Sequence, residues 1–139
     1  MNDRYLFRGK RVDNCEWVVG VAFFKNEKCF IITDMFNCDE YQCTGAENYE
    51  VIPETVEQCS GVPDKNGKLM FEGDIINALL DFGMPIKSVC AFRDGSFGLL
   101  AKQHGAEHFH PFTSLCNISY EIIGNIHDNK ELLDWSNTK

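Results

Sequence analysis

Turn-forming sequences interrupt this chain at short intervals, and no other feature limits its fold more. They are Asp13-Asn14, Lys25-Asn26, Asp64-Lys65-Asn66-Gly67, Gly83-Met84-Pro85 and Asp94-Gly95. The runs between them are short and rich in β-branched and aromatic residues, as in the strands of all-β sandwiches and barrels. The spacing therefore predicts antiparallel strands joined by tight turns, and a mainly β fold class.

The first part of the chain predicts an irregular β region. Its strands are expected at 4–7, 17–24, 29–33 and 50–52. A polar turn at Asn26 joins two of them into a hairpin. Residues 34–49 are mixed and acidic without a clear period, which predicts a loop. The last strand ends at Pro53, which cannot donate to a strand ladder, and we expect the domains to be 1–53 and 54–139.

The second part predicts a small curled barrel of the SH3-like kind. Its strands are expected at 74–82, 87–92, 96–101, 108–112 and 120–126. Asp94-Gly95 is the strongest hairpin signal, because both residues tolerate the positive φ angles of a type I′ turn. Five short strands in so few residues suit a small barrel.

A short C-terminal helix is expected at 129–135, with Leu132, Leu133 and Trp135 on its apolar side. A helix of this length is not stable alone in water, so it must dock on the body of the protein or on another subunit. Small barrels also leave strand edges that attract partners. A closed symmetric homo-oligomer would cover both features with one interface, so we expect self-association.

The charge balance is acidic, with 21 Asp and Glu against 13 Lys and Arg and a net charge of −8. A protein that tracks phosphates needs a positive face to displace counterions. The basic residues cluster once, at Arg4, Arg8, Lys10 and Arg11. Nucleic acid is therefore disfavoured as a partner, and a regulator that uses this cluster is kept as the alternative.

The compartment is expected to be the cytoplasm. No segment has the apolar length of a membrane span or the apolar core of a signal peptide. The seven cysteines are Cys15, Cys29, Cys38, Cys43, Cys59, Cys90 and Cys116. Because their number is odd and no secretion signal is present, reduced thiols are expected. Several of them should serve as small core hydrophobes.

The sharpest candidates for metal ligands are His104, His108, His110 and Cys116. His108 and His110 lie two residues apart, so on a strand they share a face and could begin a zinc site. Strong zinc motifs carry two tight ligand pairs, and that pattern is missing here. We therefore expect no bound metal and no cofactor. No cysteine sits in a recognisable nucleophile motif and no glycine loop has phosphate-binding context, so no catalytic residue is assigned.

Three segments of the chain resemble one known family in order and spacing. The opening segment is Phe7-Arg8-Gly9-Lys10, which leads to Trp17-Val18-Val19-Gly20. The central block comprises Glu54-Thr55-Val56, Gln58, Gly61, Asp64-Lys65-Asn66-Gly67 and Phe71-Glu72-Gly73-Asp74-Ile75-Ile76. The closing segment is Glu121-Ile122-Ile123-Gly124-Asn125-Ile126-His127-Asp128-Asn129 with Leu132-Leu133. On these residues the chain is identified as a member of the YopX family of phage and prophage proteins.

The resemblance implies a mostly β fold with an irregular N-terminal part and an SH3-like C-terminal barrel. It supplies no catalytic activity and no ligand that could be carried over. Cys15 stands where the family usually has Gly, Cys59 where it usually has an aromatic residue, and Lys130 where it often has Pro. The recurring residues are interpreted as fold requirements: Gly67 is expected at positive φ, and Gly124-Asn125 is expected to bend the last strand.

These observations together predict a non-enzymatic, phage-encoded interaction protein in the cytoplasm of the bacterial host. It is expected to bind host or phage proteins through exposed strand edges and aromatic surface. The alternative hypothesis is a nucleic-acid-associated regulator that uses the basic cluster. The third hypothesis is a metal-dependent enzyme built on His108 and His110.

Overall fold

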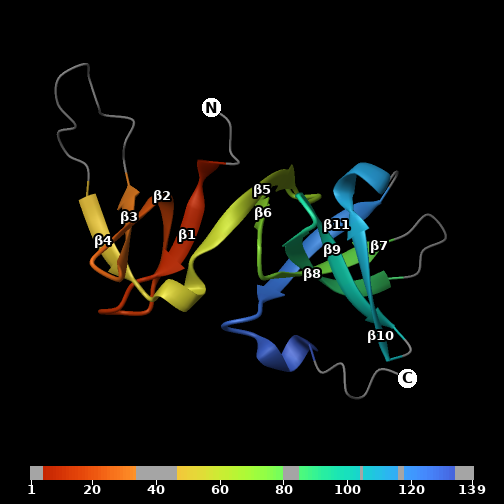
Figure 1. The fold of residues 1–139 in the computed structure, drawn as a ribbon. Coiled ribbons are helices and arrows are strands. Elements are labelled where there is room, and N and C mark those ends of the chain that lie inside the picture. The colour runs from red at the N-terminus through yellow and green to blue at the C-terminus, as the bar shows by residue number, and fades with distance from the viewer. Residues whose placement is uncertain (1–4, 34–46, 80–84, 104, 116–117, 134–139) are drawn as a thin grey trace. The chain divides into compact units, whose positions relative to one another are not determined.

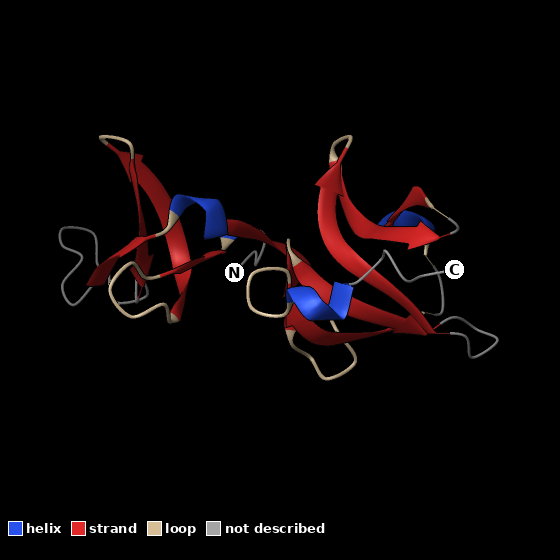
Figure 2. Cartoon of the chain, turned by 90° about the horizontal axis from the view of Figure 1, so that it is seen from below, coloured by secondary structure: helices blue, strands red, loops and turns tan. Residues whose placement is uncertain are grey.

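The computed structural model describes residues 5–33, 47–79, 85–103, 105–115 and 118–133. The chain divides into two compact units, Met1–Cys59 and Ser60–Lys139. Both units consist of antiparallel strands joined by loops and 3₁₀ turns (Figures 1 and 2). The expected mainly β class is confirmed. The expected domains, 1–53 and 54–139, stay a prediction.

The strands are β1 (Phe7–Lys10), β2 (Trp17–Lys25), β3 (Lys28–Thr33), β4 (Glu47–Val51), β5 (Glu57–Pro63), β6 (Leu69–Phe71), β7 (Asp74–Leu79), β8 (Pro85–Arg93), β9 (Ser96–Gln103), β10 (Ala106–Pro111) and β11 (Ser119–Asn125). Between and after them lie the 3₁₀ helices η3 (Pro53–Thr55), η4 (Phe112–Ser114) and η5 (Lys130–Leu133). No described helix is long and apolar enough to cross a membrane.

Most of the expected strands are confirmed within a few residues, and the differences come from long-range pairing. The strand expected at 4–7 lies at Phe7–Lys10, where β1 pairs with β2 on one side and β5 on the other. The expected loop at 34–49 is wrong at its end, because 47–49 begin β4. The strands β5 and β6 were not expected, since Gly61 and Pro63 weaken the local strand signal.

The strands β1 to β4 of the first unit belong to a six-stranded sheet with the order β4-β3-β2-β1-β5-β6. Its core cluster consists of Cys29, Ile31 and Val51, with partly buried side chains from β1, β2 and the segment after η3 packed against them. One end of the sheet curls until β1 meets β4, through a bridge between Arg11 and Val51. Glycine at position 9 permits this approach, because a β-carbon there would lie 2.9 Å from Val51 Cγ2.

The second unit carries a five-stranded sheet in the order β10-β9-β8-β7-β11. Its core cluster is Met70, Ile76, Ala78, Cys90 and Leu99. The SH3-like closed barrel expected here is not seen, because in the described part of the chain β10 pairs only with β9 and β11 only with β7. The described strands therefore form an open sheet.

Two hairpin turns follow directly from local sequence. Asp94 and Gly95 have φ values of 51° and 84°, so the expected type I′ turn between β8 and β9 is confirmed. Asn26 and Glu27 have φ values of 53° and 66° and form the same kind of turn between β2 and β3. The expected bend near Gly124 is also confirmed, as the pairing of β11 with β7 shifts between Ile122 and Gly124.

The turn between β5 and β6 is built around the buried side chain of Asp64. Its Oδ1 accepts hydrogen bonds from the backbone N–H groups of Asn66 and Lys68, both at 2.9 Å. Its Oδ2 accepts a third, at 3.2 Å, from the N–H of Ile122 on β11. The N–H of Lys65 donates to the Tyr120 carbonyl at 2.8 Å. Gly67 closes the turn at φ 82°, as expected. This turn thereby occupies the outer edge of β11.

The C-terminal segment forms a single 3₁₀ turn, η5, and the described part of the chain contains no α-helix. The expected helix over 129–135 is therefore corrected to Lys130–Leu133, and Trp135 lies outside the described residues. The cause is local: the Leu132 N–H donates to the Asn129 carbonyl three residues back, at 2.9 Å. Leu132 and Leu133 are half-buried.

Three cysteines, Cys29, Cys59 and Cys90, are buried in the cores, as expected for small core hydrophobes. Burial raises the pKa of the Cys29 thiol, which keeps it in the neutral form. Cys15 differs, because it is exposed and has a φ of 61°. This is the left-handed region, which costs an L-residue with a β-carbon roughly 1–2 kcal/mol. Glycine, which the family resemblance places there, adopts it freely.

We expect Cys15→Gly to raise the free energy of unfolding by about 0.5–1 kcal/mol, because relief of backbone strain exceeds the added flexibility of the unfolded chain. Urea titration followed by tryptophan fluorescence measures the change. Cys15→Ala is the matched control, since it removes the thiol but keeps the β-carbon and should leave stability unchanged. Equal stabilisation by both variants would contradict the assignment of strain to φ.

Asp64 should make stability depend on pH. Burial opposes ionisation of its carboxyl group, but the hydrogen bonds from Ile122, Lys68 and Asn66 outweigh it and hold the pKa below the ordinary value of 3.8. The carboxylate therefore adds stability above pH 3.8, and this contribution is lost as the pH falls through the folded-state pKa.

We expect Asp64→Asn to cost about 1–3 kcal/mol at pH 7, because one of the backbone donors loses its acceptor. The difference from wild type should shrink as the pH falls below 3.8 and through the lowered pKa of Asp64, as measured by urea unfolding across pH. Asp94→Asn is the control, because Asp94 is exposed and asparagine also tolerates its positive φ. A difference between Asp64→Asn and wild type that does not vary with pH would exclude a role for the charge.

Candidate functional site

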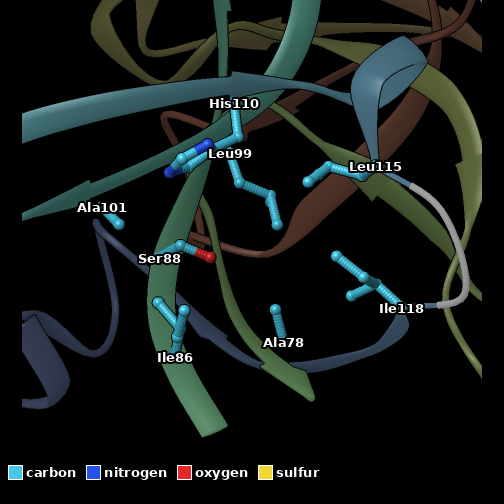
Figure 3. A pocket seen from close by; sticks show the side chains of 8 residues that line it. All are labelled: Ala78, Ile86, Ser88, Leu99, Ala101, His110, Leu115 and Ile118. Carbon is cyan, nitrogen blue, oxygen red and sulfur yellow. The ribbon is translucent and has the colours of Figure 1, made fainter. Parts of the chain in front are cut away.

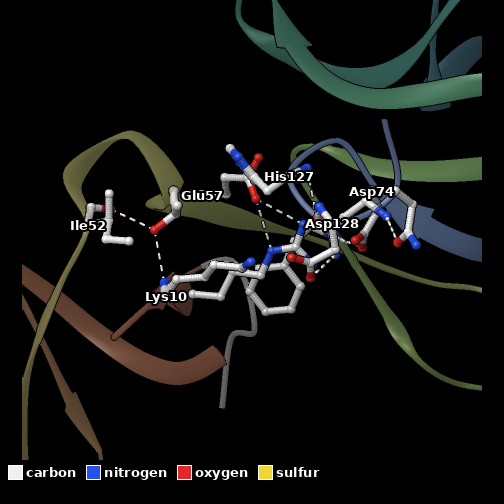
Figure 4. A network of polar contacts seen from close by, with 11 residues as sticks. Lys10, Ile52, Glu57, Asp74, His127 and Asp128 are labelled. Atoms are coloured by element: carbon white, nitrogen blue, oxygen red, sulfur yellow. Dashed lines mark hydrogen bonds and ion pairs between the residues drawn. The ribbon is translucent and has the colours of Figure 1, made fainter. Parts of the chain in front are cut away.

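The opening residues of the family resemblance hold the first unit together. The Arg8 guanidinium donates to Glu57 Oε1 through Nε at 3.1 Å and through an Nη at 2.9 Å (Figure 4). Both side chains are about nine-tenths buried. Arg8 also lies 4.7 Å from the centroid of the Trp17 ring, and the Lys10 ammonium lies 5.6 Å from it. These residues fix β1 between β2 and β5, which is a structural task.

The Thr55 hydroxyl joins β1 to η3 in the same unit. Its Oγ1 accepts from the Lys10 N–H at 2.9 Å and donates to the Ile52 carbonyl at 2.6 Å (Figure 4). Thr55 is buried, so both backbone groups are satisfied without water. The central block of the family resemblance thus contributes backbone support here as well.

The central and closing blocks do the same in the second unit. Asp74 accepts a hydrogen bond from the Phe71 N–H at 2.8 Å, which shapes the turn into β7. Gly73, at φ 84°, donates to the Cys90 carbonyl and accepts from the Ile126 N–H. Asn125 and Asn129 bond each other across the final turn. These contacts stabilise the backbone, in keeping with the interpretation of the recurring residues as fold requirements.

Two residues of the basic cluster, which the alternative hypothesis assigns to nucleic acid, bind carboxylates. Arg8 faces Glu57, and Arg11 contacts both carboxylate oxygens of Asp13, at 2.9 and 2.6 Å. The hydrogen bond from Arg11 holds the pKa of Asp13 below its usual range. Arg11 also lies 4.3 Å from the centroid of the Tyr49 ring. Arg4 lies outside the described residues.

Two of the four candidate metal ligands can be placed. His108 and His110 both lie on β10, where they share a face as expected and are exposed. His104 and Cys116 lie outside the described residues. Among the residues that the structure describes, no three His, Cys, Asp or Glu side chains gather as they would around a metal ion. The expectation of no bound metal stays a prediction.

His110 lines a pocket that sequence reasoning missed (Figure 3). The pocket has a volume of about 180 Å³ and lies within the second unit. Its apolar lining consists of Ala78, Ile86, Leu99, Ala101, Leu115 and Ile118. Ser88 adds a hydroxyl, but that group donates to the Ile76 carbonyl at 3.2 Å. The pocket is therefore suited to an apolar group, with the His110 imidazole at its side.

A second surface lies on the outer face of the first sheet, and we call Val19, Val21, Phe23, Phe30 and Ile32 the β2–β3 strip. Val21 pairs with Ile32 and Phe23 with Phe30, so these side chains share the face opposite the core residues Cys29 and Ile31. The Phe23 and Phe30 rings stack at 5.2 Å. Val19 and Val21 are 45% and 39% exposed, and the other three are half-buried. The strip is a partly exposed row of apolar side chains on two neighbouring strands.

The sequence did carry a signal for this strip. From Trp17 to Phe24, β2 is apolar on both faces rather than alternating. A strand with one core face and an apolar outer face needs a second covering layer or a partner. The pocket had no comparable signal, because its lining comes from four strands and the segment after η4.

The arrangement defines a class: a two-unit, mainly β protein whose motif residues stabilise backbone and whose apolar surfaces remain open. A comparison of the sequence with known protein families identifies the family of this chain. The YopX protein family matches residues 6–134, and the chain belongs to that family. Comparison with curated proteins gives no match.

The buried Arg8–Glu57 pair should be a large single contributor to the stability of the first unit. We expect Arg8→Met to cost about 3–5 kcal/mol, because it leaves the Glu57 carboxylate buried without its main counter-charge. The double variant Arg8→Met, Glu57→Leu should recover much of that loss. Urea unfolding of both proteins measures the effect. A double variant no more stable than the single would show that the pair is not the source of the loss.

Proposed function

We propose that this chain is a phage- or prophage-encoded, non-enzymatic interaction protein that binds host or phage proteins in the bacterial cytoplasm. One observation carries the proposal, namely the exposed apolar β2–β3 strip. Contiguous apolar surface of this kind on a folded protein marks an interaction site, because leaving it in water is unfavourable. The stacked Phe23 and Phe30 rings supply the aromatic character that interface centres favour.

The nucleic-acid alternative has less support. A phosphate-binding face needs free cations, whereas Arg8 and Arg11 are bonded to carboxylates and the chain carries a net charge of −8. The metal-enzyme hypothesis likewise lacks a gathered ligand set among the described residues. A protein partner could bind the apolar strip without free cations and without a set of metal ligands.

Two finer proposals accompany the main one. The second unit is related to SH3-like barrels, which the consecutive antiparallel order of β7, β8, β9 and β10 supports. The chain also forms a homo-oligomer, for which the β2–β3 strip offers a symmetric contact as well as the C-terminal segment does. Neither the relation to SH3-like barrels nor the homo-oligomer is needed for the proposal that the chain binds a protein partner.

Site-specific photo-cross-linking tests the interaction directly. A photoreactive phenylalanine analogue replaces Val21 in the strip, or Val12 as a matched control that is 50% exposed but lies outside it. The variants are expressed in a host that carries the intact phage genome. We expect one or a few discrete adducts from position 21 and none from position 12.

A second substitution gives the same test an internal control. Val19→Lys places a charge on the strip and should abolish the adducts from position 21, because a charged group cannot be buried without a counter-charge. A band at twice the 15.9 kDa chain mass would identify the partner as a second copy. Equal labelling from positions 12 and 21, or adducts that survive Val19→Lys, would refute the strip as an interface.

A further inference from the structure

The two edge strands of the second sheet, β11 and β10, differ in the hydrogen bonds made by their outer edges. The outer edge of β11 is occupied by the Asp64 turn, through the bonds to Ile122 and Tyr120. The outer edge of β10 has no pairing strand in the described part of the chain. An edge strand without a neighbour presents a row of N–H and C=O groups that can pair with another chain. Ala106, Glu107, His108 and His110 on this strand are exposed.

The open edge lies beside the apolar pocket. Leu99 pairs with His110 and Ala101 with His108, and directly opposite residues share a face of the sheet. His108 and His110 therefore stand on the same face as the pocket-lining side chains of β9, and His110 itself lines the pocket (Figure 3). A strand added to β10 would run about 4.8 Å away and place alternate side chains on this face.

The volume of the pocket limits the size of the group that can bind in it. Its volume of about 180 Å³ is below the roughly 300–1,000 Å³ of sites for small-molecule ligands. It is close to the roughly 150 Å³ of an apolar cavity that accepts a benzene molecule. One side chain of the size of leucine or phenylalanine would fit this volume.

We propose that β10 accepts an extended segment of a partner protein as an added strand, and that one apolar side chain of that segment enters the pocket beside His110. Main-chain pairing supplies affinity in this mode, and the pocket supplies specificity. The segment alternates apolar and basic residues, because the chain carries a net charge of −8 and Glu107 is exposed on the opposite face of β10. This surface is separate from the β2–β3 strip, so the two proposals fail independently.

The probe is a short synthetic peptide in which leucine and lysine alternate, titrated into the isotope-labelled full chain at physiological ionic strength. Amide chemical shifts report the binding position. We expect saturable shifts on β10, β9 and the pocket-lining segments. A block peptide of the same composition, with all leucines before all lysines, should bind at least about tenfold more weakly, because its side chains cannot alternate between the two faces.

Two changes separate strand addition from simple charge attraction. Methylation of alternate backbone nitrogens in the peptide removes the donors that would pair with β10 and should weaken binding about tenfold or more. Ala101→Leu fills the pocket and should have a similar effect, whereas Ala91→Leu makes the same change on β8 outside the pocket lining and should have little. If Ala101→Leu fails to fold, the comparison of the methylated with the unmethylated peptide still distinguishes strand addition from charge attraction.

Three results would overturn the proposal. They are shifts outside β10 and the pocket, equal binding of the methylated and unmethylated peptides, and absence of saturable shifts at millimolar peptide. A doubling of mass without peptide, with β10 amides protected, would assign the edge to a second copy instead. The photo-cross-linking result at Val21 is unaffected by any of these outcomes.

Discussion

The carboxylate of Asp64 determines which edge of the second sheet is closed. Three backbone N–H groups converge on it, two from its own turn and one from Ile122 on β11. The cost of burying a charge is met by these donors, as its lowered pKa reflects. With β11 capped in this way, the outer edge of β10 is the one without a pairing strand among the residues that the structure describes. The edge strand β10 contributes His110 to the pocket lining, and we propose that the sheet is extended by a partner strand on this side.

The residues that identify the chain as a YopX protein act on the backbone. Arg8 and Glu57 set β1 between its neighbours, and Gly9 allows β1 to approach Val51. Gly73 and Asp74 shape the entry to β7. Their contacts described above are with other parts of the same chain. We propose that binding takes place on surfaces outside the motifs, namely the β2–β3 strip and the β10 edge.

The sequence predicted what depends on neighbouring residues. The type I′ turn at Asp94-Gly95 follows from two residues that tolerate positive φ, and the shared face of His108 and His110 follows from strand alternation. It could not predict what depends on distant pairing. The strand β5 has weak local propensity and forms because β1 pairs with it. The sequence also did not show that Arg8 of the basic cluster pairs with Glu57, which is 49 residues further along the chain. The residues that line the pocket come from four strands and the segment after η4, so no local sequence pattern predicts the pocket.

Native-state amide hydrogen exchange tests the asymmetry of the two edges most directly. In this account the N–H groups of Lys65 and Ile122 are bonded across the β11 edge and exchange slowly. Alternate N–H groups of β10 face solvent, so they should exchange far faster than those of the central strand β8. Slow exchange along all of β10 in the isolated chain, or fast exchange at Ile122, would contradict the claim that one edge is closed and the other open.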